Sequence, residues 1–506
     1  MVMPATHSHL PAREPWILAT TILGSSMAFV DGTVVNVALP TLQRELGASL
    51  AGVQWVVEAY ILFLTALMLT GGALGDRLGR RRVFAAGVAL FAAASLACGL
   101  APSVNALILA RAVQGIGGAL LIPGSLALLT ATFPPERRGR AIGVWSSFSA
   151  ITTGLGLVLG GWLIDTAGWR WIFFINLPVA VITLALCFRV VPPHRPTQAG
   201  PLDPGGALLA TVALGGWVFG LIEISRLGFT HPAVLGALLL GAVASVGFWR
   251  WERRVPHPMV PVALFRAPRF AAANLLTLFL YAALGAMFFF VPMNLIQVHG
   301  FSSFAAGAAN TPFIVLMFLL SRYSGGLADR FGARPLLMAG PLLGALGYGW
   351  LGLGAGWGYW WGFFPGIVVL GFGMAFSVAP LTATVMGSVM EARAGVASGI
   401  NNAISRGAGL VSIACLGPVI YLVFSLSLEA RLREAGVDEG LITAFRPAWI
   451  DLGAARPPAG LSAPLTASLE IMVRDAFVDG FRVVMGVLML LAVLAAAVAH
   501  RGLREP

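Results

Sequence analysis

Long apolar runs separated by short, arginine-rich connections occupy almost the whole chain. About 20 consecutive apolar residues are needed for a helix to cross a bilayer, whereas the strands of a membrane barrel alternate in polarity over about 10 residues. The sequence has no alternating segments of that kind, so the pattern predicts membrane-spanning helices. Fourteen spans are expected, at 16–38, 53–74, 83–101, 104–128, 140–164, 170–190, 205–224, 233–250, 270–294, 303–321, 335–353, 359–383, 396–422 and 479–499.

The composition agrees with an integral membrane protein. Of the 506 residues, 58% are hydrophobic and only 10% are charged, whereas about a quarter of a soluble domain is charged. The net charge of +11 comes from arginine alone, and no nucleic-acid motif accompanies it, so nucleic acid is not an expected partner. The three cysteines, Cys98, Cys187 and Cys415, lie in apolar runs and have neither disulfide nor metal-binding spacing.

The arginines also predict which helix ends face the cytoplasm. The short odd-numbered connections hold only Arg44, Arg170 and Arg226. Cytoplasmic connections carry an excess of basic residues, so both termini are expected in the cytoplasm, with residues 1–15 and 501–506 as tails. The even-numbered connections hold Arg77, Arg80, Arg81, Arg82, Arg137, Arg138, Arg140, Arg189, Arg195, Arg250, Arg253, Arg254, Arg266, Arg269, Arg322, Arg330, Arg334 and Arg393.

Two parts of the chain are internal copies. The segment G-G-A-L-G-D-R-L-G-R-R at 71–81 returns as S-G-G-L-A-D-R-F-G-A-R at 324–334, and I-T-T-G-L-G-L-V at 151–158 matches I-S-R-G-A-G-L-V at 404–411. An even number of spans separates the copies, so the repeats share one orientation. This predicts an all-α membrane fold of two six-helix bundles related by a parallel repeat, plus two inserted central helices. The N-terminal bundle is expected at 16–190, the linker with the two extra helices at 191–269, and the C-terminal bundle at 270–500.

Four motifs carry a resemblance to a known family. They are V-D-G-T-V-V-N-V-A-L-P at 30–40, G-A-L-G-D-R-L-G-R-R-R at 72–82, L-I-L-A-R-A-V-Q-G-I-G-G-A at 107–119 and W-R-W-I-F-F-I-N-L-P at 169–178. With the fourteen spans, they make the chain similar to the major facilitator superfamily, in its fourteen-helix drug:proton antiporter branch of the multidrug efflux type.

The resemblance implies a secondary active transporter rather than an enzyme. Its expected activity is proton-coupled export of amphipathic small molecules or drugs by alternating access, which would confer antibiotic resistance. The expected partners are a small-molecule substrate, protons and the lipid bilayer of the bacterial cytoplasmic (inner) membrane. The proton gradient supplies the energy, so no cofactor or metal is expected, and the chain is expected to act as a monomer.

The fifth span departs from the antiporter motif of that branch. Leu157 stands where the motif has proline, which removes the expected kink, while Gly154, Gly156, Gly160 and Gly161 still permit close helix packing. The alternative function is therefore a dedicated exporter of one endogenous substrate, such as a lipid, fatty acid, siderophore or metabolite, with altered proton coupling.

The polar segment 425–478 is expected as a long outer loop. Within it, L-E-A-R-L-R-E-A is typical of a short amphipathic helix that lies on the protein or on the membrane surface. The loop either covers the transport path or simply connects two spans, and the simple connector is favoured.

A conformational gate is expected at the cytoplasmic connection after the second span. Charged residues there can form ion pairs in one conformation and release them in another, although arginines at this place can also serve topology alone. The gate residues implied by the resemblance are Gly72, Asp76, Arg77, Gly79, Arg80 and Arg81, with Asp329 and Arg330 in the second copy.

Few ionisable residues lie deep in the spans, and such residues are costly and usually functional. Asp31 in the first span and Arg111 in the fourth are the natural opposite charges, and they predict either a proton-coupling site or a static pair that joins helices. Desolvation and a nearby guanidinium act in opposite directions on a buried carboxyl group, so a change of surroundings can load or release its proton.

The remaining polar residues of the spans have more than one interpretation. Glu58 is a second proton-coupling residue, a counter-charge for a cationic substrate, or a side chain that reaches the outer interface. Arg406 either binds an anionic substrate or pairs with an acid elsewhere. Hydrogen bonds between helices are the default for buried amides. With Asp31, Glu58 and Arg406, the residues expected at the substrate cavity are Gln114, Asn294 and Gln297.

Overall fold

The structure, a computed structural model, describes residues 13–193, 202–390 and 394–503, and these residues are helical with no strand. Thirteen of the described helical segments are long and apolar enough to cross a membrane. Helix α5, Pro135–Ala167, is not among the thirteen and contributes a shorter apolar segment, Gly154–Ala167. The described residues are therefore those of an all-α, multi-pass membrane protein. The N-terminal half contains α1 (Glu14–Leu46), α2 (Leu50–Leu78), α3 (Arg80–Gly99), α4 (Val104–Thr132), α5, α6 (Trp171–Phe174) and α7 (Asn176–Val190).

The C-terminal half follows the same order of helices. Two of its expected spans are broken where proline begins a new helix, at Pro312 and Pro365, because proline is favoured in the first turn. The span expected at 170–190 is likewise divided, into α6 and α7. The C-terminal helices are α10 (Pro268–Gln297), α11 (Ser303–Ala308), α12 (Thr311–Phe331), α13 (Ala333–Leu353), α14 (Tyr359–Gly362), α15 (Phe364–Gly387), α16 (Ala394–Glu434) and α18 (Ala463–Gly502).

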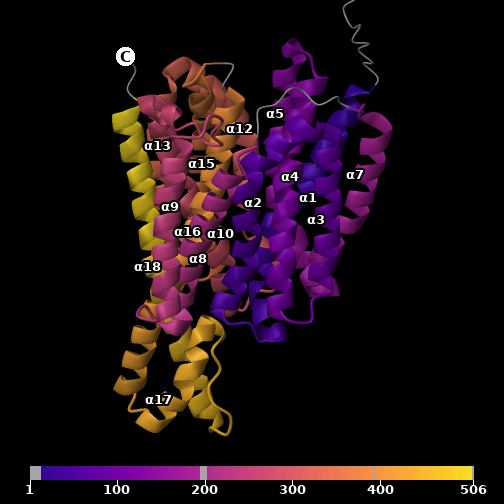
Figure 1. Cartoon of the computed structure of the whole chain (residues 1–506). Coiled ribbons are helices and arrows are strands. Elements are labelled where there is room, and N and C mark those ends of the chain that lie inside the picture. Colours follow the sequence, from indigo (N-terminus) through magenta and orange to yellow (C-terminus); the bar gives the residue numbers. More distant parts are fainter. Residues whose placement is uncertain (1–12, 194–201, 391–393, 504–506) are drawn as a thin grey trace, which may run out of the picture.

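The two halves repeat one packing pattern. In the N-terminal half α1 packs on α5 and α7, α2 on α4, and α3 on α4 and α7. In the C-terminal half α10 packs on α16 and α18, α12 on α15, and α13 on α15 and α18. Each pair in the first list corresponds to a pair in the second, which is the arrangement that the internal sequence repeat predicts. Figure 1 shows the two halves side by side, with α1 beginning and α18 ending at the same end of the molecule.

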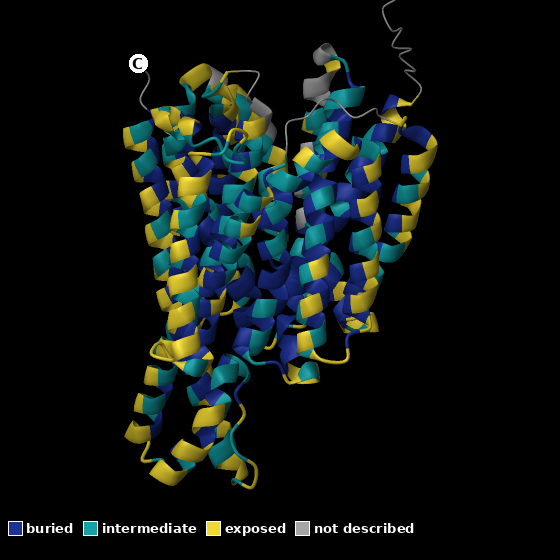
Figure 2. Cartoon of the chain, in the orientation of Figure 1, coloured by how far each residue is buried: buried dark blue, intermediate teal, exposed yellow. Residues whose placement is uncertain are grey.

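Helices of the two halves pack directly on each other. Helix α5 packs on α11 and α12, α2 packs on α16, and α1 packs on α10. Buried residues gather inside the bundles and between them, whereas exposed residues cover outer helices such as α9 and α18 (Figure 2). Large apolar side chains such as Leu239 and Val243 of α9 are exposed, as expected for a surface that faces lipid.

The helices between the halves form a hairpin at the rim. Helices α8 (Pro204–Leu227) and α9 (Pro232–Glu252) pack on each other, and α8 also contacts α2 and α16. Trp55 of α2 donates to Glu223 of α8 through a hydrogen bond of 3.2 Å. The hairpin is followed by a short 3-10 helix, η1 (Val262–Arg266). The pair that is central in the sequence therefore lies at the periphery in space, against both halves.

The polar segment expected as an outer loop at 425–478 is largely helical. The stretch expected as a short amphipathic helix on a surface is instead the continuation of α16, which runs unbroken to Glu434. It stands out of the bundle beside the first half of α18 (Figure 1). Apolar residues pack inside this protrusion, and Arg431 pairs with Asp479 across it at 2.8 Å. Between the two helices lie α17 (Glu439–Phe445) and η3 (Arg446–Ala454), and η3 contacts α1, α2 and α10.

Candidate functional site

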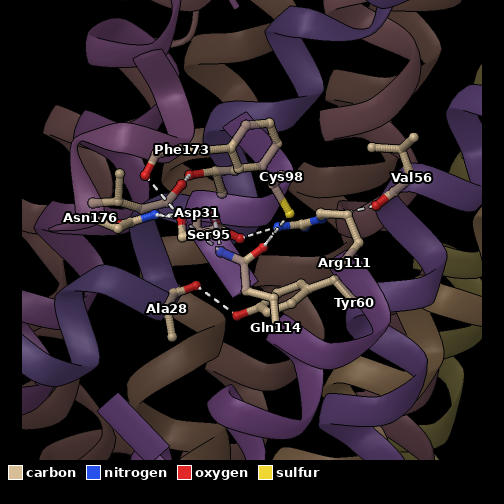
Figure 3. Close-up of polar contacts among 12 residues, drawn as sticks. Ala28, Asp31, Val56, Tyr60, Ser95, Cys98, Arg111, Gln114, Phe173 and Asn176 are labelled. Carbon is tan, nitrogen blue, oxygen red and sulfur yellow. Dashed lines mark hydrogen bonds and ion pairs between the residues drawn. The ribbon is translucent and has the colours of Figure 1, made fainter. Parts of the chain in front are cut away.

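A buried ion pair lies near the middle of the N-terminal half. Asp31 lies halfway along α1 and is 0% exposed, and Arg111 of α4 is 1% exposed. The Nη1 atom of Arg111 contacts Oδ2 of Asp31 directly (Figure 3). Two charges in a low-dielectric interior are stable only when they are paired and further hydrogen bonded. The expected opposite charges are therefore in contact, and their other bonds decide whether the pair is satisfied.

Gln114 connects both members of the ion pair. It follows Arg111 by three residues on α4, so the two side chains share one face of the helix. Its Nε2 atom donates to Oδ1 of Asp31 at 2.8 Å, and its Oε1 atom accepts from Arg111 at 2.7 Å. Gln114 was expected at a substrate cavity, but in this conformation it is fully buried and holds the ion pair together.

Asn176 and Ser95 complete the surroundings of the carboxylate. Asn176, the first residue of α7, donates to Asp31 at 3.3 Å and to Ser95 of α3 at 3.0 Å. Ser95 in turn donates to the carbonyl of Phe173 at 2.9 Å. Asn176 is not among the site residues predicted from the sequence, although it is the asparagine of the motif at 169–178. An amide in an apolar span was the available signal.

The guanidinium of Arg111 also contacts an aromatic ring and a backbone carbonyl of α2. The guanidinium carbon lies 4.3 Å from the centroid of the Tyr60 ring, and Nε donates to the carbonyl of Val56 at 3.0 Å. The hydroxyl of Tyr60 donates to the carbonyl of Ala28 at 3.1 Å. The site joins α1, α2, α3, α4 and α7 through one hydrogen-bonded network around the pair of Asp31 and Arg111.

Glu58 lies apart from this network. Its side chain is 0% exposed, and neither carboxyl oxygen has a hydrogen-bond partner. The interpretation that Glu58 reaches the outer interface is therefore wrong. Gln54, one turn earlier on α2, donates to the carbonyl of Ile413 at 3.0 Å, so this face of α2 is turned toward α16. A buried carboxyl group without a partner is costly, and such groups are often functional.

The remaining expected cavity residues lie in different surroundings. Gln297 of α10 donates to Gln43 of α1 at 2.9 Å and thereby links the two halves. Asn294, one turn earlier, is fully buried, and both polar atoms of its side chain lack a partner. Arg406 of α16 lies across from α1, with its guanidinium carbon 5.4 Å from the centroid of the Phe29 ring.

The expected gate residues are bonded mainly within the N-terminal half. Asp76 pairs with Arg80 at 2.9 Å, and Arg80 also donates to the carbonyl of Ala127. Arg81 donates to the carbonyl of Phe188 at 3.0 Å. Gly79 joins α2 to α3 at a φ of 98°, which a residue with a Cβ rarely adopts.

The other expected gate residues make fewer described contacts. Arg77 is exposed, and Gly72 lies beside Pro123 of α4. In the second copy, the guanidinium of Arg330 lies 5.3 Å from the Phe331 ring centroid. Asp329 is in α12, but its side chain lies outside the described residues.

The glycines of α5 allow three other helices, α1, α11 and α12, to pack closely against it. A Cβ on Gly156 or Gly160 would stand 2.3 Å from a side-chain atom of Thr33 or Val34 on α1. A Cβ on Gly161 would stand 2.3 Å from the carbonyl oxygen of Ser303, at the start of α11. A Cβ on Gly154 would stand 2.4 Å from a side-chain atom of Ile314 on α12. Close packing in this region thus persists with Leu157 in place of proline.

The C-terminal end of α5 is also bonded to the opposite half. Both carboxylate oxygens of Asp165 accept from backbone amides at the start of α11, from Ser303 at 3.2 Å and from Phe304 at 2.9 Å. Among the described residues, no group of three or more histidine, cysteine or acidic side chains could hold a metal ion.

Comparison with known proteins gives a consistent class. The profile described as Major Facilitator Superfamily matches residues 21–413. The chain is 34% identical to the tetracenomycin C resistance and export protein of Streptomyces glaucescens, over 98% of this chain and 94% of that protein. It is 35% identical to the multidrug resistance protein Stp of Mycobacterium tuberculosis, over 83% and 78% of the two chains. It is also 35% identical to the methylenomycin A resistance protein of Streptomyces coelicolor, over 84% and 90%.

Solved structures support the same fold. A bacterial homolog of the human lysosomal transporter Spinster, in an inward-facing and unoccupied conformation, superposes with a TM-score of 0.66 at 20% identity. The match covers 96% of both chains. At this identity the likeness concerns the fold alone.

Proposed function

Because this chain belongs to the major facilitator superfamily, as its profile match and its relatives show, we propose that it is a proton-coupled exporter of amphipathic small molecules. The observation that carries the proposal is the buried pair of Asp31 and Arg111 with its amide partners. In an otherwise apolar bundle, an ionisable group held between helices is expected to move a proton. The relatives named for resistance to several drugs, or to one antibiotic, support export as the direction.

Asp31 is proposed to bind the transported proton, with Arg111 as the group that releases it. While the pair is intact, the guanidinium of Arg111 contacts the carboxylate directly. Protonation of Asp31 would free Arg111 and weaken the links between α1 and α4, so a proton and a conformational change become coupled. Glu58, which has no partner in this conformation, is proposed as a second proton site on the face of α2 toward α16.

Alternating access is supported by where the halves are bonded. Three contacts between the halves lie on the side of the protrusion. They are the bonds of Asp165 to α11, the bond between Gln43 and Gln297, and the contacts of η3 with α1 and α2. On the opposite side, Arg80 and Arg81 bond carbonyls of their own half. We therefore infer a conformation whose halves are joined at the outer end, while Arg80 and Arg81 at the opposite end bond their own half.

The membrane arrangement is part of the proposal. Both described ends lie on one side, and this side carries the arginines of the connections after α2 and α12, so it is assigned to the cytoplasm. Fourteen spanning helices follow when the whole of α5 is counted with the other thirteen segments. The protein is proposed to work as a monomer in the bacterial cytoplasmic membrane, driven by the proton gradient without a cofactor.

The test begins with a resistance profile. Expression in a drug-sensitive bacterium should raise the tolerated concentration of several unrelated amphipathic compounds. Resistance to a single compound would favour the alternative, a dedicated exporter of one substrate. This alternative has support from relatives named for one antibiotic each.

Proton coupling is then measured with a compound that the profile identifies. In respiring everted vesicles, its addition should release protons from the acidified lumen, and Asp31→Asn should abolish this release. Asp475→Asn, which changes an exposed aspartate of the protrusion, is the matched control and should exchange normally. Normal proton release from the Asp31→Asn protein would refute the assignment.

A further inference from the structure

Arg406 places a positive charge between the halves of the molecule. It belongs to α16 in the C-terminal half, and its guanidinium carbon lies 5.4 Å from the ring centroid of Phe29 on α1. The side chain is half-buried, and Asn402, one turn earlier on α16, is exposed. Residues four apart share one face of a helix. The face of α16 that carries Arg406 is thus accessible within a turn of the guanidinium.

This arginine has no acidic partner in the part of the chain that the structure describes. Asp31, the aspartate of the neighbouring network, is taken by Arg111. The carboxyl oxygens of Glu58 have no hydrogen-bond partner, so they do not bond Arg406 either. The ion pairs among the described residues leave this guanidinium unneutralised, whereas buried arginines in membrane proteins ordinarily pair with an acid or with backbone carbonyls.

Aromatic side chains from three helices lie near the unpaired charge. Phe29 comes from α1, and the phenols of Tyr60 on α2 and Tyr281 on α10 lie within electrostatic range of Arg406. The hydroxyl of Tyr60 is already bonded to Ala28. The Tyr60 ring itself contacts Arg111. Flat apolar surfaces beside a guanidinium suit a planar molecule with an acidic group.

We propose that Arg406 binds the anionic group of the transported substrate, and that the preferred substrates are planar aromatic acids: carboxylates, sulfonates or ionised phenols. The ring system lies against Phe29 and Tyr281, and the anion bonds the guanidinium. This inference rests on the proposed export function and specifies its substrate class. The guanidinium fork matches two oxygens of one carboxylate or sulfonate, which lysine cannot do equally well.

The test compares two fluorescent probes that share a skeleton. Anilinonaphthalene sulfonate carries one negative charge, and phenylnaphthylamine is its uncharged parent. Binding of each is measured to the purified full chain in lipid nanodiscs, with empty nanodiscs subtracted. The wild-type protein should bind the sulfonate more tightly than the parent, and Arg406→Gln should weaken sulfonate binding about tenfold while parent binding stays within about threefold.

Two further variants make the result specific. Arg406→Lys keeps the positive charge and should retain part of the preference for the sulfonate. Arg170→Gln is the matched control, because Arg170 also stacks on a ring, that of Trp169 at 4.3 Å, but is exposed and outside the interface. It should leave the binding of both probes unchanged. Retained parent binding shows that each variant is folded.

The outcomes separate the anion site from the export function. A wild-type protein without preference for the sulfonate, or an equal loss in Arg406→Gln and Arg170→Gln, would overturn the anion site. If Arg406→Gln does not fold, the comparison of the two probes on the wild-type protein still tests whether the anion is preferred. Sulfonate binding that depends on Arg406, in a protein that releases no protons on substrate addition, would support the site and refute proton-coupled export.

Discussion

Gly307 of α11 packs directly against the backbone carbonyl of Leu157 on α5, so that a Cβ on Gly307 would stand 2.1 Å from this oxygen. The contact joins the two halves at the position where the antiporter motif has proline. Because real Cβ atoms do not approach an oxygen so closely, the glycine is required for this conformation.

Gly307→Ala should therefore separate α5 from α11 and favour the conformation that is open at the outer end. A single cysteine introduced at Gln43, beside the same interface, should react faster with a membrane-impermeant thiol reagent in this variant. Gly486→Ala on α18, where a Cβ meets nothing within 4 Å, is the control and should leave the rate unchanged. Equal labelling of both variants would argue against a gate at this contact.

Arg111→Gln and Asp31→Asn should both destabilise the fold. Each change leaves one buried charge without its counter-charge, and breaking a buried pair in this way costs about 3 to 5 kcal/mol. The double variant removes both charges, so its loss should be smaller than the sum of the two single losses. Thermal unfolding in detergent gives the drop in Tm for all three variants. A loss in the double variant equal to that sum would mean that the pair contributes little to the fold.

Asn176→Ala should destabilise the N-terminal half. Asn176 donates to the Asp31 carboxylate at 3.3 Å and to Ser95 at 3.0 Å. Leaving a buried polar group without its partner costs about 1 to 3 kcal/mol, so Tm in detergent should fall. The matched change Asn105→Ala, on an exposed asparagine of α4, should leave Tm in place. An unchanged Tm in Asn176→Ala would exclude a structural role for this amide.

Glu58→Gln should leave the protein folded and lower the number of protons exchanged per substrate. The carboxyl group has no partner to lose, so Tm is expected to stay the same or rise. Proton and substrate fluxes measured in the same vesicles give the ratio for the variant and the wild type. An unchanged ratio would remove Glu58 from the proton pathway, and a marked drop in Tm would show that the carboxyl has a structural partner.

The protrusion should become less stable as the pH rises from about 4. Burial raises the pKa of Asp451 in η3, so the folded segment holds a proton that the unfolded segment has already lost. The unfolded state then binds fewer protons in this range, and folding stability falls with rising pH. Hydrogen exchange of the η3 amides, corrected for intrinsic rates, should show this trend in the wild type. The trend should be smaller in Asp451→Asn and unchanged in Glu434→Gln, an exposed control.

Much of the fold is predictable because the bilayer imposes a strict pattern. The order of the apolar segments and the internal repeat both appear in the helix packing. Helix ends are less predictable, since a helix continues beyond the hydrocarbon where its residues are polar. Thus α1 extends to Leu46, past Arg44, and α16 runs on to Glu434. Polarity marks where a chain leaves the membrane and does not mark where its helix ends.

The pairing at the site was predictable from charge, and its network was not. Asp31 and Arg111 are opposite charges in the same half, so their contact follows from the cost of burying either alone. Gln114 and Asn176 are two amides among many in the sequence. They bond the same carboxylate only because α1, α4 and α7 cross beside it. The isolation of Glu58 is likewise a consequence of which face α2 turns toward α16.

The helical protrusion continues two helices that pack inside the C-terminal half. About 15 Å of α16 and about 24 Å of α18 extend beyond the bundle as uninterrupted continuations of these helices. The protrusion also touches the other half, because η3 contacts α1 and α2. A tilt of the C-terminal half is therefore expected to move α17 relative to the N-terminal half. A fluorophore on α17 would report this movement on the side opposite the start of α1 and the end of α18.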